Sequence, residues 1–266
     1  MTPEKIEQYR DRLWRRDASL RLRTVEDLEA MVEDLGFCLA MTDERKKMPS
    51  VYIAVCGRRD AHLPRNVQKD EESRAAWILK DEAIARGRVY YAKLFKGHSM
   101  FVSRQLVPIF NSLWGCSRAG ESGVLSATAL RILAALRTEW ELATADIFKV
   151  AGAQSKAELS KAMDELQKRM KIIPSEVAYV PKFTYIWTPS EIRFEEELKE
   201  KLPRDEAIYR LAKVYLRTFG MTLRGELAGR FGISRAEAGR SNQRLVREKL
   251  AENLDRGIYL WNDIQL

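Results

Sequence analysis

Histidine is scarce in this chain of 266 residues, where only His62 and His98 occur. The cysteines Cys38, Cys56 and Cys116 are odd in number and show no C-x-x-C spacing. A zinc site of His and Cys ligands and a nucleophile–histidine relay are therefore both disfavoured, and we expect no metal and no cofactor. Cysteines of this kind are typical of reduced thiols, so we expect a cytoplasmic protein.

Long apolar runs are also missing, and no stretch approaches the length of a membrane span. The N-terminus is charged from Glu4 onward, unlike a signal peptide. Neither G-x-x-x-x-G-K nor G-x-G-x-x-G occurs, which argues against nucleotide-driven chemistry. Charge is abundant, because 46 Lys and Arg stand against 38 Asp and Glu, giving a formal net charge of +8. We therefore expect no membrane partner and favour a polyanion.

The segment 222–250 has the pattern of a helix-turn-helix. Leu227 and Phe231 share one face of a short helix, and Gly232 permits a sharp turn after it. Ser234 then offers its hydroxyl to the first amides of a second helix, whose apolar Ala238 and Leu245 should face inward.

The other face of that second helix is basic. At about 100° per residue, Arg240, Gln243, Arg244 and Arg247 fall within roughly a third of a turn on that face. Guanidinium and amide groups suit phosphates and base edges, although a solvated basic face is the alternative interpretation. The DNA-binding candidates in this region are Arg235, Arg240, Gln243, Arg244 and Arg247.

Two further stretches are basic. Residues 45–69 carry much of their charge on loops around the apolar segment 51–56. The DNA-binding candidates in this stretch are Arg58, Arg59, Arg65 and Lys69. Residues 86–104 hold no acid and read as two strands, 89–95 and 99–102, joined by a Lys-Gly-His turn. This hairpin predicts either a wing lying along DNA or an ordinary hairpin with a tyrosine face packed inward. Its candidates are Lys93, Lys96 and His98.

The second half of the chain repeats itself with a period of about 80 residues, which suits tandem small domains. Each copy has three helices followed by aromatic-rich strands, the arrangement of a winged helix. We therefore predict a mainly α fold with short β-hairpins (α+β), built from tandem winged-helix domains. The predicted segments are a helical arm (1–18), a basic winged-helix-like domain (19–114), a linker (115–123), a winged helix (124–189), a connecting helix (190–204) and a winged helix (205–266).

The two copies of the second half differ in charge. The helix that Ser155 opens mixes lysines with Glu158, Asp164 and Glu165, so its field largely cancels. We expect this copy to be structural or to face a partner, and the copy at 234–249 to be the better DNA reader. Between the copies, Thr188-Pro189-Ser190-Glu191 reads as a capping box that opens the connecting helix.

The run Trp77-Ile78-Leu79-Lys80-Asp81-Glu82 leads into the hairpin that begins Val89-Tyr90-Tyr91, and helix-turn-helix units follow in tandem. In this arrangement the chain resembles, over residues 20–260, the winged-helix proteins grouped with the AlkZ/YcaQ-like DNA glycosylases. That family excises bulky alkylated bases and crosslinks. The resemblance implies tandem winged helices around a concave face that binds double-stranded DNA.

Members of that family that act as glycosylases carry a Gln-apolar-Asp or Gln-apolar-Gln triplet just after an early helix, which positions water at the sugar carbon. The matching stretch here, 36–40, reads Gly-Phe-Cys-Leu-Ala and has neither group. Gln68-Lys69-Asp70 has the outline but places lysine at the apolar position. The family's C-terminal β-rich domain is also not expected, because the chain ends at the last wing. We carry no catalytic residue over from the family.

Other groups could still serve base excision. Carboxylates in or beside the basic N-terminal unit are candidates, each with a surface ion pair as the alternative: Asp43, Glu44, Asp60, Asp70, Asp81 and Glu82. Trp77, Tyr90 and Tyr91 could stack on a displaced base or belong to the core.

Three hypotheses follow. The first is a DNA-binding protein of tandem winged helices, non-enzymatic or catalytically degenerate. The second is a DNA glycosylase with a non-standard active site, and the third is a protein–protein interaction module. A homodimer is compatible with all three, although the internal repeat already supplies pseudo-symmetry.

Overall fold

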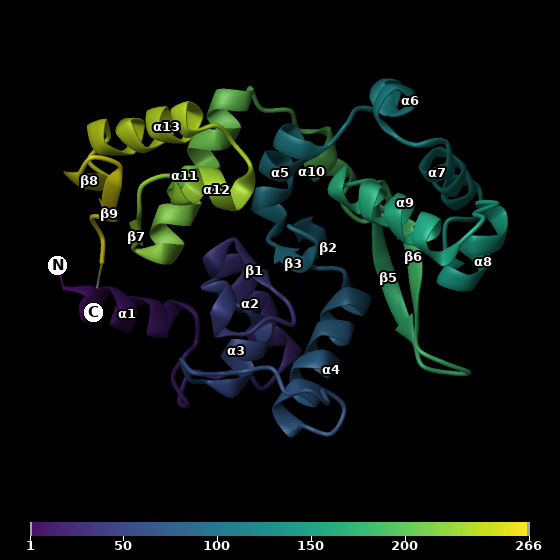
Figure 1. The fold of residues 1–266 in the computed structure, drawn as a ribbon, viewed down its shortest axis with the longest axis horizontal. Helices are drawn as coiled ribbons and strands as arrows, with labels where there is room; N and C mark the ends of the chain where they lie inside the picture. Colours follow the sequence, from purple (N-terminus) through teal and green to yellow (C-terminus); the bar gives the residue numbers. More distant parts are fainter. Residues whose placement is uncertain (1, 265–266) are drawn as a thin grey trace.

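The computed structural model describes residues 2–264 and shows three mainly helical units arranged in an arc, each with a small antiparallel sheet (Figure 1). The first unit lies at the lower middle of the view, the second at the right and the third at the upper left. Helix α1 (Pro3–Leu13) precedes them and packs on the third unit, where Trp14 Nε1 donates to the carbonyl of Thr218 at 2.9 Å.

The three units share one strand order, in which the last strand lies in the middle of the sheet. The first comprises α2 (Val25–Leu35), β1 (Phe37–Leu39), η1 (Glu44–Lys46), α3 (Val51–Cys56), α4 (Glu71–Arg86), β2 (Tyr90–Phe95) and β3 (His98–Val102). η2 (Arg104–Leu106), α5 (Val107–Trp114), η3 (Arg118–Gly120) and α6 (Glu121–Val124) connect it to the second.

The second unit comprises α7 (Ala127–Glu139), β4 (Leu142–Ala143), α8 (Thr144–Val150), α9 (Lys156–Lys168), β5 (Ile172–Ala178) and β6 (Thr184–Pro189). η4 (Ser190–Ile192) and α10 (Glu195–Lys199) follow it. The third comprises α11 (Arg204–Phe219), β7 (Met221–Thr222), α12 (Glu226–Phe231), α13 (Arg235–Arg247), β8 (Ala251–Asp255) and β9 (Ile258–Trp261). Helix, short strand, two helices and a hairpin is the order of a winged helix, so the predicted fold class is confirmed.

Local sequence signals set the ends of the key helices. Thr24 and Asp27 form a capping box at the start of α2, in which the Asp27 amide donates to the Thr24 hydroxyl at 3.1 Å and the Thr24 amide donates to the Asp27 carboxylate at 3.0 Å. Helix α2 stops at Gly36, whose φ of +86° favours glycine. Ser234 caps α13 as predicted, and Glu237 completes a second capping box there.

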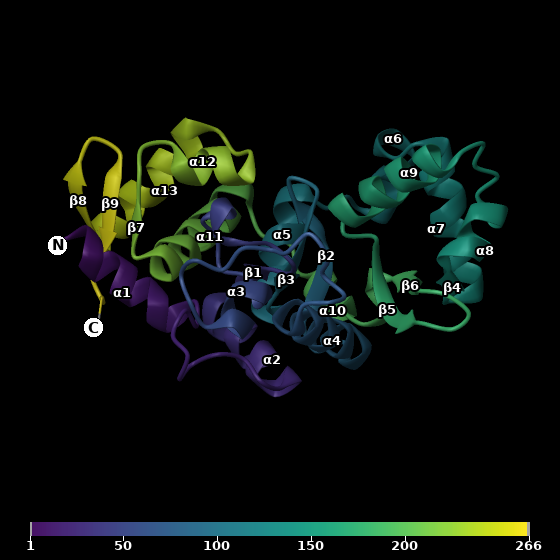
Figure 2. The same ribbon diagram turned by 60° about the horizontal axis from the view of Figure 1, so that its bottom comes forward.

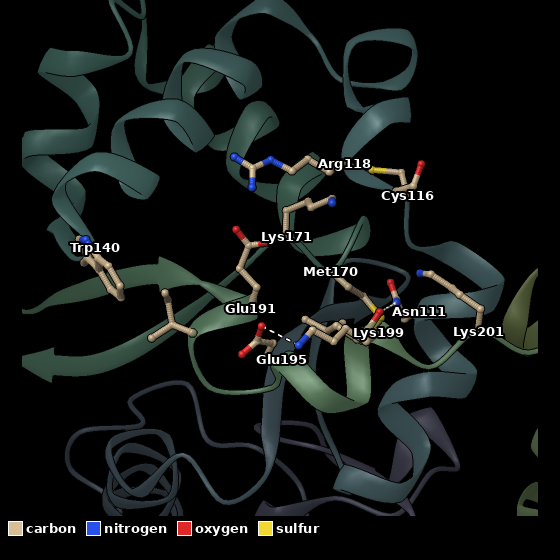
Figure 3. A pocket seen from close by; sticks show the side chains of 13 residues that line it. Asn111, Cys116, Arg118, Trp140, Met170, Lys171, Glu191, Glu195, Lys199 and Lys201 are labelled. Atoms are coloured by element: carbon tan, nitrogen blue, oxygen red, sulfur yellow. Dashed lines mark hydrogen bonds and ion pairs between the residues drawn. The ribbon is translucent and has the colours of Figure 1, made fainter.

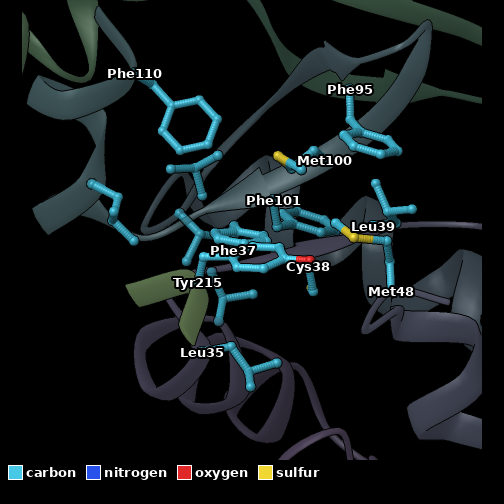
Figure 4. Packing of buried hydrophobic residues seen from close by; sticks show 14 of the residues in the cluster. Leu35, Phe37, Cys38, Leu39, Met48, Phe95, Met100, Phe101, Phe110 and Tyr215 are labelled. Carbon is cyan, nitrogen blue, oxygen red and sulfur yellow. The ribbon is translucent and has the colours of Figure 1, made fainter. Parts of the chain in front are cut away.

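Two hydrophobic cores hold the units. The larger one is continuous from the first unit into the third, and the smaller one belongs to the second unit alone. Strand β1 lies in the larger core, with Phe37 between Phe110 and Tyr215 (Figure 4). The ring of Phe231, on α12, lies 5.5 Å from that of Phe37 in an edge-to-face arrangement. The third unit is thus packed onto the first through α12.

The predicted capping box at 188–191 and the connecting helix over 190–204 are wrong. Thr188 and Pro189 end strand β6, where they pair with Ile173 and Ile172. The Thr188 hydroxyl donates to the carbonyl of Trp140 at 2.8 Å and caps nothing. Sheet pairing has overridden the local helix signal, and only η4 and the five-residue α10 form in this segment.

The predicted linker over 115–123 is folded, since it contains η3 and part of α6. Glu121 is buried there and forms ion pairs with Arg137 at 2.7 Å and Lys171 at 2.6 Å. Burial raises the pKa of Glu121, but these hydrogen bonds and charges outweigh it and leave the pKa below its ordinary value. The segment is therefore tied to the second unit.

Within residues 2–264, no single helix is long and apolar enough to cross a membrane. The length and apolar composition of a membrane span are reached within these residues only when two segments are taken together, Arg104–Val124 and Ala127–Glu139. These two segments are bent by 114° relative to each other.

Candidate nucleic-acid interface

The first two winged helices cover each other's third helix. Strand β2 of the first unit packs on α9, and strand β5 of the second unit packs on α4. The third helix is the one that a winged helix offers to a DNA groove. In these two units it is occupied by a neighbouring hairpin.

The contact of β2 with α9 uses charges that the sequence had suggested for DNA. The Lys93 ammonium lies 2.8 Å from the Asp164 carboxylate, and the Lys93 amide donates to Gln167 Oε1 at 3.0 Å. The mixed charge of α9 is thus explained in part by an intramolecular partner.

The contact of α4 with the β5–β6 hairpin contains a buried ion pair. Lys80 is 1% exposed, and its ammonium donates to the Asp81 carboxylate and to the Tyr185 hydroxyl, the latter at 3.0 Å. Tyr179 donates to the other oxygen of Asp81. The same ammonium lies 4.4 Å from the ring centre of Trp77, which packs edge-to-face on Phe183. These polar contacts join the first unit to the second.

Helix α13 is different, because its main contacts within the described part of the chain come from α11, α12 and β8 of its own unit. Ala238 and Leu245 are buried as predicted, at 5% and 0% exposure. Four residues on its open side are exposed or half-buried, and we call them the α13 surface: Arg235, Arg240, Gln243 and Arg247. Helix α13 lies along the upper edge of the molecule (Figure 1).

The wing of the third unit extends the α13 surface. Gly225 lies close to Arg235, since a Cβ on this glycine would be 3.4 Å from Arg235 Nε. Gly257, in the turn of the wing, also lies close to Arg224, since its Cβ would be 3.1 Å from Arg224 Cγ. Arg224 and Arg256 are both exposed, although the wing also carries exposed Glu252 and Asp255. The sequence reasoning missed these two arginines, and the only signal for them was the Asp255-Arg256-Gly257 turn.

Several predicted DNA contacts are engaged in ion pairs. Arg58 binds Glu72 at 2.5 Å, and Arg59 binds Glu4 at 2.9 Å and also Asp11. On α13, Arg244 binds Glu206 at 2.7 Å and Glu248 at 2.9 Å, with its guanidinium 3.6 Å from the ring centre of Tyr209. Gln243 donates to the Tyr259 hydroxyl at 3.1 Å. The arginines of this group have their charge largely neutralised.

Others carry no ion pair within residues 2–264: Arg65, Lys69, Lys96, His98, Arg235, Arg240 and Arg247. Burial, together with the charge of nearby Lys46, lowers the pKa of His98, so this imidazole is neutral near pH 7. Arg65 and Lys69 lie on the segment between α3 and α4, at the lower edge in Figure 1 and opposite α13. Arg65 and Lys69 therefore lie apart from the α13 surface, whereas Lys46 of the same stretch lies near His98, and its carbonyl accepts from Arg230 of α12 at 3.3 Å.

Strand β1 holds the stretch that we predicted from the sequence to match the catalytic triplet of AlkZ/YcaQ-like glycosylases. Phe37, Cys38 and Leu39 are each 0% exposed and lie among other apolar side chains (Figure 4). Burial raises the pKa of the Cys38 thiol, which is therefore inert. Nothing on this strand can position water.

Three of the six candidate carboxylates are committed elsewhere. Asp43 binds Arg45 and accepts from the Leu63 amide at 3.4 Å, and Asp81 binds Lys80 and Tyr179. Asp70 caps α4 by accepting from the Ser73 amide at 2.7 Å.

The remaining three candidates are more exposed. Asp60 lies 3.8 Å from Arg58 with its side chain 83% exposed, and Glu44 lies 3.5 Å from His62. Glu82 is exposed on α4 and lines a shallow hollow against the start of α2. None of the three lies beside the α13 surface.

A pocket of about 610 Å³ lies where α5 and α10 meet the second unit (Figure 3). Its two carboxylates are paired, Glu191 with Arg137 at 3.1 Å and Glu195 with Lys199 at 2.8 Å. Burial and the charge of Lys171 lower the pKa of Lys201. The pocket therefore holds cations but no free carboxylate to act as a base.

Within residues 2–264, no three His, Cys, Asp or Glu side chains gather in a group that could hold a metal ion.

The fold and the site define a protein of three winged-helix units, in which the first two cover each other and the third leaves a basic helix open. A family model described as "AlkZ related" matches residues 22–211. The chain therefore belongs to the AlkZ-related family.

A solved structure, the DNA glycosylase AlkZ of Streptomyces sahachiroi, is similar to this chain with a TM-score of 0.62 and 12% sequence identity. The similarity covers 99% of this chain and 70% of that one, and at this identity it shows the fold. The resemblance predicted from the sequence is confirmed. No curated protein matches the sequence.

Proposed function

We propose that this protein binds double-stranded DNA through the α13 surface, with the wing β8–β9 lying against the backbone. The observation that carries the proposal is that α13 is left open, whereas hairpins cover α4 and α9. A helix that presents Arg235, Arg240 and Arg247 without an ion-pair partner in the described part of the chain suits a polyanion.

Membership of a DNA-repair-related family supports the same partner. The similar solved structure is that of a DNA glycosylase, which by its name acts on DNA. Helix α13 lies beyond residue 211, where the family match ends. The choice of α13 as the contact therefore rests on its exposure and charge.

The salt dependence of duplex binding tests the proposal. Each phosphate contact contributes about −0.9 to the slope of log K against log [salt]. We expect Arg240→Gln and Arg247→Gln each to reduce the slope by about 1 and to weaken binding to all sequences similarly. Fluorescence anisotropy of a labelled duplex at several salt concentrations measures this.

Arg244→Gln is the matched control, because it lies on the same helix but its charge is held by Glu206 and Glu248. This substitution should leave the slope nearly unchanged, with circular dichroism confirming that α13 remains folded. Equal slopes for the wild type and the Arg240→Gln/Arg247→Gln double variant would remove α13 as the contact.

We further propose that strand β1 supports no base excision, so that the protein is catalytically degenerate at that position. Duplexes that contain N-alkylated purines should yield no abasic sites above background after incubation with the protein. Release of a damaged base that survives substitution of every exposed candidate carboxylate would contradict this. Release that is lost on substituting one of them would support a glycosylase with a non-standard site.

A further inference from the structure

A second pocket, of about 620 Å³, lies between the first two units and is mostly apolar. Strand β6, helices α8 and α9 and the hairpin β2–β3 surround it. Figure 2 shows β6, α8 and α9 at the right of the molecule and the hairpin β2–β3 near its middle. Its size is typical of sites for small planar ligands.

Aromatic side chains form one wall of this pocket. Phe183, Tyr185 and Trp187 alternate along the strand and share one face of it. Phe183 and Tyr185 lie 5.3 Å apart, and Tyr185 and Trp187 lie 5.6 Å apart, both edge-to-face. Phe183 is 41% exposed, and Phe148 of α8 lines the pocket half-buried. No two of these wall rings stack face to face, so a planar ligand can still stack on them.

The wall is held rigidly from behind. The Tyr185 hydroxyl accepts from the buried ammonium of Lys80 at 3.0 Å, and Trp187 Nε1 donates to the Thr144 hydroxyl at 3.0 Å. Rings fixed in this way bind at a lower entropic cost than mobile ones.

The rim of the pocket is positive. Lys156 and Lys182 line it, are exposed and have no ion-pair partner in the described part of the chain. Asp164 is the one acid of the lining, and Lys93 neutralises it at 2.8 Å. An aromatic wall with a cationic rim is complementary to a ligand that joins a planar ring to an anion.

We infer that this pocket accepts an unpaired nucleotide of single-stranded DNA. The base stacks on the β6 rings, and the adjoining phosphates lie at Lys156 and Lys182. Aromatic side chains bind bases in this way with little sequence preference, and lysines follow the backbone. The inference adds a second DNA contact to the duplex contact of the proposed function and depends on different residues.

The probe is a labelled single strand of twelve thymidines, and its partner is the same strand with abasic residues at its centre. We expect the wild type to bind the thymidine strand at least about 5-fold more tightly, because stacking contributes about 5- to 150-fold per base. Phe183→Ala should remove most of that preference. Phe148→Ala gives a second test from another element, with circular dichroism showing that both variants are folded.

The lysines have their own control. Lys156→Gln/Lys182→Gln should weaken binding of both strands and reduce its salt dependence. Lys168→Gln, on the same helix but outside this pocket, should have a smaller effect. Equal affinity for the thymidine and abasic strands would overturn the inference, and so would unchanged binding by both phenylalanine variants.

Failure of this inference is distinguishable from failure of the proposed function. Arg240→Gln/Arg247→Gln should weaken duplex binding and leave the base-dependent single-strand preference intact. Phe183→Ala should do the reverse. Loss of only one of these two patterns removes only the corresponding site.

Discussion

Substituting Asp81 by Asn removes one partner of a buried ion pair on α4, which lies at the contact between the first two winged helices. Lys80 would keep only the neutral amide of the substituted side chain, the Tyr185 hydroxyl and the faces of Trp77 and Tyr185, at 4.4 and 5.2 Å. Breaking a buried pair in this way costs about 3–5 kcal/mol, because an uncompensated charge is left inside. This is a large share of the stability of an ordinary domain, about 5–15 kcal/mol.

The cost should depend on pH in a defined direction. Burial lowers the pKa of Lys80 below its ordinary value of 10.5, while the hydrogen bond and charge of Asp81 act against this. At pH values between the lowered pKa of Lys80 in the folded protein and its pKa in the unfolded chain, the unfolded chain binds more protons than the folded protein. The stability that this group contributes therefore rises with pH in that range. Removing the Asp81 carboxylate lowers the folded pKa of Lys80 further and widens that window. The deficit of Asp81→Asn should therefore shrink between about pH 7 and about pH 9.5.

Urea denaturation of the wild type and the variant at both pH values measures the deficit. Lys80→Met/Asp81→Leu is the matched control, since replacing both charges by apolar groups should cost far less than removing one. A deficit below about 1 kcal/mol, or one equal at both pH values, would refute this account of the pair.

Three further outcomes are expected. Gly36→Ala should lower the free energy of unfolding in urea by more than about 1 kcal/mol, because φ at this position is +86° and the new Cβ would lie 2.2 Å from a methyl group of Leu106. Gly239→Ala is the control, because this glycine has open space around it on α13 and its substitution should cost no stability. Phe231→Ala should lower the free energy of unfolding by about 3–5 kcal/mol, because five aromatic rings surround the ring of Phe231. A loss near zero would contradict the packing of the third unit on the first. A hydrogen bond from Arg204 and then the cap at Ser234 lower the pKa of Glu237 to about 2. Ser234→Ala should therefore raise the NMR titration midpoint of Glu237 and lower the free energy of unfolding by about 1 kcal/mol. An unmoved midpoint would exclude the capping box.

The mutual covering of α4 and α9 gives three similar units different exposed surfaces. The hairpins at these helices use the aromatic and charged side chains that would otherwise meet a partner. The first two units therefore form a scaffold with a pocket at their junction, and the third unit keeps the open helix. The sequence had suggested a structural or partner-facing role for the α9 copy from its mixed charge alone.

The sequence predicted what depends on neighbours along the chain. Helix caps, glycine stops and alternating strands act over a few residues, so α13 and the hairpin of β2 and β3 lie where they were expected. The same kind of signal failed at Thr188, where pairing with a distant strand was stronger than a local cap. The apolar composition of 36–40 was also sufficient to exclude a catalytic triplet there.

The tertiary structure alone decided which charges are free. Arg240 and Arg244 are four residues apart on one helix, yet Glu206 from α11 neutralises only Arg244. Similarly, Lys80 and Lys156 look alike in the sequence, but one is buried against Asp81 and the other stands at the rim of a pocket. Charge is fixed by composition, whereas its neutralisation depends on partners that only folding brings together. For this reason the sequence could point to a basic helix at 234–249 and favour a polyanion, whereas which of its arginines are free could not be inferred from it.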